Sequence, residues 1–157
     1  MKELARALPS KRATNRLAAD LAPLLTPADL VLLAGPLGAG KTFFARALGR
    51  ALGLAADQRV TSPTFSLVHE YDTRPKLVHA DLYRLGDDER AVCELGLLAM
   101  RDEGAVLVVE WGVPFERVLG GDALVLSLAR EPRQAVISAT GPRAQELLEA
   151  LSGIGVE

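Results

Sequence analysis

The chain is poor in the residues that build disulfides and zinc sites. It has one cysteine, Cys93, and two histidines, His69 and His79, in 157 residues. A single cysteine excludes an internal disulfide, and no cluster of His and Cys side chains suggests a zinc site. Cys93 lies in a helical pattern and is predicted to be a small core residue rather than a nucleophile. His79 is expected to be a strand residue that packs or forms a hydrogen bond near the functional site, and His69 to be a strand-edge residue. Neither is expected to be catalytic.

The sequence also lacks a surplus of basic charge and any long apolar run. Its net charge of −2 at pH 7 disfavours tight, nonspecific binding of nucleic acid. No apolar run is long enough to cross a membrane, and the opening stretch MKELARALPSKR lacks the apolar core of a signal peptide. A cytoplasmic location without a membrane partner is therefore expected. The length and the 49% content of hydrophobic residues predict one globular domain over residues 1–157.

A glycine-rich turn stands out between a predicted strand and a predicted helix. The apolar run at 30–34 predicts a buried strand, and residues 41–52 carry apolar side chains at helical spacing. Between them GPLGAGKT, starting at Gly35, follows the pattern G-x-x-x-x-G-K-T. Its backbone N–H groups can converge on an anion, and the helix N-terminus adds partial positive charge. The pattern predicts triphosphate binding, with Lys41 reaching the β- and γ-phosphates and the Thr42 hydroxyl on Mg²⁺.

The rest of the chain alternates predicted strands with predicted helices. Beyond residues 30–34 and 41–52, helices are expected over 13–25, 87–100 and 142–151. The stretch 61–71 is expected to be a hydroxyl-rich loop that runs into a strand, and the stretch 76–85 a strand that ends near Asp81. Further strands are expected over 105–111, 123–129 and 134–140. This alternation favours an α/β fold, a three-layer P-loop NTPase-like architecture with a mainly parallel central sheet and flanking helices. Ligands of such sheets bind at the carboxyl ends of the strands.

Two acids close apolar strands at that edge of the sheet. Glu110 ends VLVVE, and Asp81 ends LVHAD. P-loop enzymes use an acid in such a place to bind Mg²⁺ or to position the attacking water. A charge at the end of an apolar strand is costly without a role, so both acids are functional candidates. Which one binds the metal stays open, and Asp81 has the alternative of a structural ion pair with Arg84, itself a candidate arginine finger.

Two further features bear on the nucleotide. The loop at 61–65, TSPTF, is either a γ-phosphate sensor or a plain Ser/Pro turn. The single asparagine, Asn15, leaves no N-K-x-D element to read guanine, which favours ATP over GTP. A small P-loop phosphotransferase acting on a metabolite remains an alternative, although no arginine-rich lid is evident. A nucleotide-gated binding module is another.

The motifs together resemble one family. GPLGAGKT, TSPTFSLVHEY, HADLYRL, ELG and VLVVEW follow one another in this order and are similar to the TsaE (YjeE) family of bacterial ATPases. That family is needed to make threonylcarbamoyladenosine in tRNA. The resemblance spans residues 14–133 and implies Mg²⁺-dependent ATP hydrolysis that is slow without partners. It implies TsaD and TsaB, as a complex, as those partners, with tRNA contacted only through them.

The resemblance also implies roles for individual residues. Lys41, Asp81 and Glu110 would be catalytic, and Thr42, Glu110 and Asp81 would serve the metal. The residues expected to contact the nucleotide are Thr14, Gly35, Gly38, Ala39, Gly40, Lys41, Thr42, Phe43, Thr64, Trp111 and Arg133.

Overall fold

The computed structural model describes residues 2–54 and 67–154 of the chain. Its single sheet has seven strands, and helices lie on both faces of the sheet, as the sequence predicts for an α/β fold. Within the described residues, no helix is both long and apolar enough to cross a membrane.

Four apolar strands form the parallel centre of the sheet. Strand β2 (Leu30–Ala34) lies between β5 (Val106–Glu110) and β6 (Ala123–Arg130), and β5 also pairs with β4 (Leu77–Asp81). All three pairings are parallel. The side chains of β2, β4 and β5 are almost all buried because both faces are covered, which is why these strands appear in the sequence as continuous apolar runs.

The two edges of the sheet are antiparallel. Strands β7 (Arg133–Ala139) and β1 (Glu3–Ala7) follow β6 on one side, and β3 (Val68–Tyr71) follows β4 on the other. The short connections from β3 to β4 and from β6 to β7 make hairpins, whereas a parallel pair needs a long crossover. Strand β1 was not predicted. Its residues show no apolar alternation, and it is recruited to the edge by the backbone of β7.

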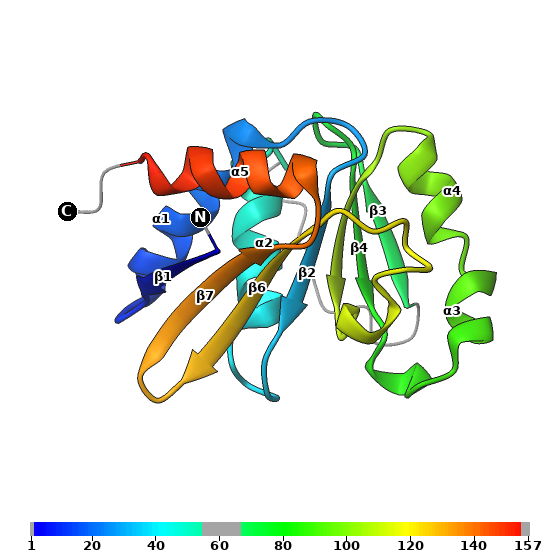
Figure 1. Ribbon diagram of the computed structural model, residues 1–157, viewed down its shortest axis with the longest axis horizontal. Helices are drawn as coiled ribbons and strands as arrows, with labels where there is room; N and C mark the ends of the chain where they lie inside the picture. The colour runs from blue at the N-terminus through cyan, green and yellow to red at the C-terminus, as the bar shows by residue number, and fades with distance from the viewer. Residues whose placement is uncertain (1, 55–66, 155–157) are drawn as a thin grey trace.

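The helices divide between the two faces of the sheet. On one face, α1 (Lys11–Leu21), α2 (Lys41–Ala51) and α5 (Pro142–Ser152) share an apolar core, and Figure 1 shows them together over one half of the sheet. On the other face, α3 (Glu89–Glu94) and α4 (Leu97–Asp102) pack against a second core. Three short 3₁₀ turns complete the elements: η1 (Ala22–Leu24), η2 (Tyr83–Leu85) and η3 (Val113–Phe115).

The first helix begins and ends earlier than predicted. The Ser10 hydroxyl caps α1 by accepting a hydrogen bond from the backbone N of Ala13 at 3.1 Å. Thr14 lies inside the first turns of the helix. Pro23 ends the α-helical pattern, and the chain continues as the 3₁₀ turn η1.

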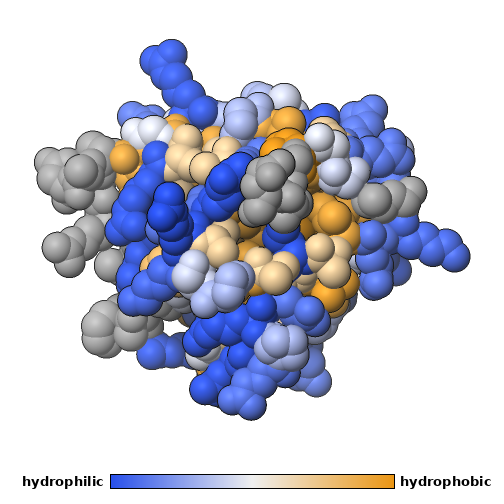
Figure 2. All heavy atoms as spheres, turned by 90° about the vertical axis from the view of Figure 1, so that its left-hand side faces the viewer, coloured by the Kyte–Doolittle hydropathy of each residue, from blue (hydrophilic) through white to orange (hydrophobic). Residues whose placement is uncertain are grey.

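From one side of the molecule the surface is mainly hydrophilic, with apolar side chains in small areas between polar ones (Figure 2).

The helix predicted over 87–100 is two helices. The chain breaks at Gly96, which has a left-handed φ of +78° between α3 and α4. Cys93, on α3, is exposed, so the prediction of a core cysteine was wrong. The helical periodicity was right on each side of the break, but a kink at a glycine changes which residues face the sheet.

Candidate functional site

The glycines of the P-loop are required by its backbone. Gly35, Gly38 and Gly40 have φ values of +136°, +79° and +105°. A Cβ on Gly35 would lie 2.3 Å from the carbonyl oxygen of Leu128 in β6. Only glycine therefore fits this first position, where the loop leaves β2 and passes directly against the neighbouring strand.

Lys41, the first residue of α2, closes the loop over its own backbone. Its ammonium nitrogen donates hydrogen bonds to the carbonyl oxygens of Gly35 at 2.6 Å and Pro36 at 2.9 Å. Burial lowers the pKa of Lys41 from its ordinary value, and the carboxylates of Glu110 and Asp81 oppose that shift. An ammonium group has three donors, so one remains for an anion held by the loop.

Glu110 meets Thr42 at the end of β5. The Thr42 hydroxyl lies 3.0 Å from each carboxylate oxygen of Glu110, whose side chain is buried. Oε2 of Glu110 also lies 2.7 Å from Nε2 of His79, a fully buried residue of β4. A hydroxyl and a carboxylate are hard oxygen ligands, so the Thr42–Glu110 pair fits Mg²⁺.

Asp81 lies beside Glu110 because β4 and β5 are parallel and in register at these two residues. Its Oδ1 accepts a hydrogen bond from the backbone N of Tyr83 at 3.0 Å, which fixes the start of η2. Asp81 is less buried than Glu110 and lines the open side of the site. Within residues 2–54 and 67–154, no ion pair joins Asp81 to Arg84.

Trp111 follows Glu110 in a left-handed conformation, with φ of +61°. A non-glycine residue pays about 1–2 kcal/mol for such a backbone, and strain of this kind gathers at functional sites. The turn places the indole ring 4.5 Å from the Lys41 ammonium and 4.9 Å from the ring of Tyr83. Trp111 and Tyr83 thus wall a cavity of about 320 Å³ that also contains Asp81 and Glu110.

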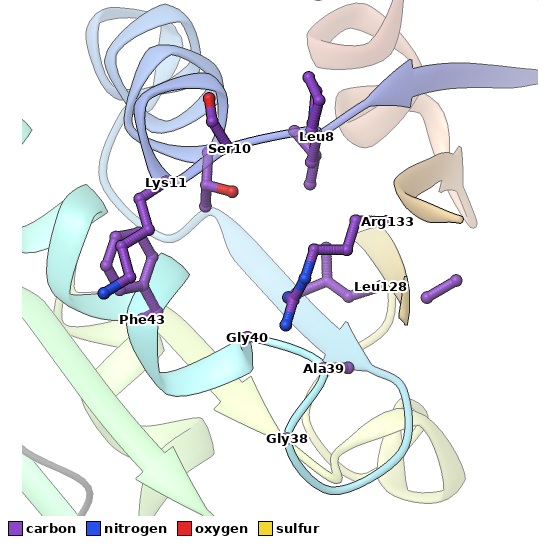
Figure 3. Close-up of a pocket in the computed structure, with 12 residues that line it drawn as sticks. Leu8, Ser10, Lys11, Gly38, Ala39, Gly40, Phe43, Leu128 and Arg133 are labelled. Atoms are coloured by element: carbon purple, nitrogen blue, oxygen red, sulfur yellow. The ribbon is translucent and has the colours of Figure 1, made fainter. Parts of the chain in front are cut away.

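A second cavity, of about 390 Å³, lies on the other side of the start of α2. It brings Thr14 of α1 and Arg133 of β7 to the P-loop. Figure 3 shows the Arg133 side chain directed towards the loop, with the Phe43 ring across the cavity and beside Lys11. The two cavities share P-loop residues, so together they suit an elongated ligand with its phosphates at the loop.

Most residues proposed from the sequence come together at these cavities. Those lining one or both are Thr14, Gly38, Ala39, Gly40, Lys41, Thr42, Phe43, Asp81, Glu110, Trp111 and Arg133. Gly35 lies at the base of the loop and accepts the Lys41 hydrogen bond. Thr64 falls outside the described residues.

Sequence reasoning missed some site residues. His79 was expected to pack or to form a hydrogen bond near the site, and its contact with Glu110 at 2.7 Å confirms this, but the sequence did not name Glu110 as the partner. The segment Leu8–Lys11 lines the second cavity because unpredicted β1 carries it there. Arg130 of β6 places its guanidinium nitrogen 3.8 Å from where a Cβ of Gly38 would lie.

Among the described residues, Thr42 and Glu110 supply only part of a metal coordination shell. In the part of the chain that the structure describes, no group of three or more His, Cys, Asp or Glu side chains could hold a metal ion. Mg²⁺ bound to Thr42 and Glu110 would therefore take its remaining ligands from phosphate oxygens and water, as Mg²⁺ commonly does.

The sheet order, the glycine-rich loop and the acid opposite it define an α/β protein of the P-loop class. A sequence model of the family described as "Threonylcarbamoyl adenosine biosynthesis protein TsaE" matches residues 8–136. The chain belongs to the TsaE family.

Individual relatives agree with this assignment. The chain is 35% identical to the Bacillus subtilis tRNA threonylcarbamoyladenosine biosynthesis protein TsaE, over 97% of this chain and 96% of the relative. It is 42% identical to the Aquifex aeolicus protein of the same name, over 66% of this chain and 82% of the relative. The crystal structure of Bacillus subtilis YdiB superimposes with a TM-score of 0.76 at 30% identity, covering 96% of this chain and 95% of that one.

Proposed function

We propose that this chain binds Mg²⁺ and ATP, hydrolyses the ATP, and supports threonylcarbamoyladenosine modification of tRNA together with the TsaB–TsaD complex. The observation that carries the hydrolytic part is the Thr42–Glu110 contact at 3.0 Å beside the Lys41 ammonium, which has one of its three donors left for an anion. The pathway part is supported by relatives named tRNA threonylcarbamoyladenosine biosynthesis protein TsaE.

The two cavities suggest how ATP would lie. The phosphates would bind the P-loop N–H groups and the start of α2. The nucleoside would enter the larger cavity, where Phe43 offers an aromatic surface, and Thr14 and Arg133 offer polar groups. The γ-phosphate would then face the smaller cavity with Asp81 and Glu110.

Each residue then has a separate part in hydrolysis. Thr42 and Glu110 would hold Mg²⁺, which when bound offsets negative charge on the phosphate oxygens. Lys41 would donate its remaining N–H to the β- and γ-phosphates. Asp81, on the open side of Glu110, would orient the water for in-line attack. Arg84 stays a candidate arginine finger, and without a finger turnover is slower by a factor on the order of a thousand or more.

The direct test is ATP hydrolysis by the purified protein, alone and with TsaB–TsaD. We expect slow turnover alone, a clear change with the partners, and loss of turnover in Lys41→Ala. Lys76→Ala is the matched control, because Lys76 lies on the surface and pairs with Glu70 at 2.6 Å. Rapid turnover that ignores the partners, or that survives Lys41→Ala, would contradict the proposal.

Two experiments separate the alternatives. Following γ-labelled phosphate distinguishes hydrolysis, which releases it as inorganic phosphate, from transfer to a metabolite by a small kinase. Asp81→Asn should stop hydrolysis and also stop modification of tRNA in a reconstituted TsaB–TsaD system. Modification that continues with Asp81→Asn would instead support a binding module gated by the nucleotide alone.

A further inference from the structure

His79 is a buried polar residue with one polar contact. Its side chain is 0% exposed in the middle of β4, between Val78 and Ala80. Its Nε2 lies 2.7 Å from Oε2 of Glu110, and its Nδ1 is buried without a hydrogen-bond partner in the described structure. Burying a nitrogen without a partner costs free energy, so an apolar side chain would suit this core better unless the contact with Glu110 has a use.

The contact defines which ring nitrogen carries the proton. An ionised carboxylate only accepts hydrogen bonds, so Nε2–H of His79 donates to Glu110. Nδ1 is the ring nitrogen left without a partner. The imidazole therefore contacts the Glu110 carboxylate through Nε2 alone, and the rest of the ring is enclosed by the core.

His79 restrains Glu110 in a way that Thr42 alone does not. The Thr42 hydroxyl has a single hydrogen and lies 3.0 Å from both Oε1 and Oε2, so it leaves the carboxylate free to present either oxygen. His79 contacts only Oε2. Oε1 is thus the oxygen available to the ligand side of the site.

We propose that His79 is a positioning residue that holds the Glu110 carboxylate in the orientation needed to bind Mg²⁺ with the nucleotide. The inference rests on the proposed function of the site. His79 does not touch the ligand, because its side chain is enclosed in the core behind Glu110. Residues that orient a metal ligand in this way change metal affinity or activity by about 10- to 100-fold when they are replaced.

Three variants test the role. His79→Leu removes the donor, His79→Gln keeps an N–H at similar reach, and His69→Leu changes the histidine that pairs with His79 across β3 and β4 but does not contact Glu110. For each folded variant, binding of a fluorescent ATP analogue is titrated with and without Mg²⁺, and kcat and KM are measured. We expect His79→Leu to require about 10- to 100-fold more Mg²⁺ or to lose kcat by that factor. Binding without Mg²⁺ should stay unchanged.

The controls separate positioning from packing. His79→Gln should recover most of the loss, and His69→Leu should behave like the unsubstituted protein. A purely structural histidine predicts altered thermal stability with unchanged Mg²⁺ dependence. That outcome, or a Gln variant no better than Leu, would overturn the proposal.

A measurement on the metal-free protein tests the contact without activity. With only two histidines in the chain, ¹⁵N-imidazole NMR resolves each ring, and His69 is the internal reference. We expect the Nε2–H tautomer at His79 and a change of its signals, but not those of His69, in Glu110→Gln. An Nδ1–H tautomer, or no response to Glu110→Gln, would overturn the inference even if His79→Leu did not fold. Failure of the unsubstituted protein to bind or hydrolyse ATP would instead reject the proposed function.

Discussion

The Thr42 hydroxyl lies 3.0 Å from both carboxylate oxygens of Glu110, although the two residues are 68 positions apart in the chain. Thr42 is the second residue of α2, and Glu110 is the last residue of β5. The contact exists because β2 and β5 are parallel neighbours, so the loop after β2 and the last residue of β5 lie at the same edge of the sheet. This pair is the feature of the protein that best fits a magnesium site.

Replacing Thr42 tests the metal assignment directly. Thr42→Ala removes a ligand oxygen, so we expect at least a tenfold rise in the Mg²⁺ concentration needed for half-maximal ATP hydrolysis. Thr42→Ser keeps the hydroxyl and should stay within a few-fold of the unsubstituted protein. A Mg²⁺ titration of the hydrolysis rate measures both. Equal Mg²⁺ dependence in Ala and Ser would remove Thr42 from the site.

The lowered pKa of Lys41 predicts how stability changes with pH. Burial is the main cause of the shift, and it disfavours the protonated form in the folded protein. Below the lowered pKa this cost is fully present. Between that pKa and 10.5, the ordinary lysine value, the unfolded chain binds more protons than the folded one, so this residue makes the free energy of unfolding rise with pH.

Urea unfolding of the unsubstituted protein and of Lys41→Met, from pH 7 towards pH 10.5, measures how the unfolding free energy depends on Lys41. We expect the difference in unfolding free energy to shift in favour of the unsubstituted protein as pH rises. Lys76→Met is the control, because its hydrogen bond to Glu70 raises the pKa of Lys76 and that contribution is lost only at still higher pH. A difference between the unsubstituted protein and Lys41→Met that is flat with pH, or that falls, would contradict the burial argument.

The first P-loop glycine should tolerate no side chain. In Gly35→Ala the new Cβ would lie 2.3 Å from the Leu128 carbonyl oxygen, in a backbone with φ of +136°. We expect a loss of about 3 kcal/mol or more in unfolding free energy, from clash and backbone strain together. Gly53→Ala has a similar positive φ of +102° but open space around the Cβ, and should lose only about 1–2 kcal/mol. Chemical unfolding of both variants checks this, and equal losses would show that strain alone matters.

Arg133 should affect nucleotide binding without affecting folding. Its side chain lies on the surface of β7 and is directed towards the P-loop across the larger cavity (Figure 3). We expect Arg133→Ala to weaken ATP binding about tenfold, the loss of roughly one charge-assisted hydrogen bond, with a stability change within about 0.5 kcal/mol. Calorimetric titration with ATP measures the affinity, and Arg90→Ala, at an exposed position of α3, is the control. Unchanged affinity in Arg133→Ala would place the nucleoside elsewhere.

The central strands and the P-loop could be predicted from the sequence because their signals are local. Leu30–Ala34 and Val106–Glu110 are apolar runs of strand length, and the pattern from Gly35 to Thr42 has a conformation that few other residues allow. Local sequence patterns did not predict elements whose structure depends on residues distant in the chain. Strand β1 has no pattern of its own, and the break at Gly96 was hidden inside a helical periodicity that continues on both sides.

The sequence by itself determined that this is a P-loop protein with two acids at strand ends, because strand, turn and helix are set by sterics and hydrogen bonds between residues close in the chain. Only the tertiary structure decided that Glu110 is held between Thr42 and His79, and that Thr14 and Arg133 reach the same loop. Those contacts depend on which strands become neighbours in the sheet and on the register in which they pair. That choice is made by burial of apolar faces over the whole sheet, and no short stretch of sequence carries it.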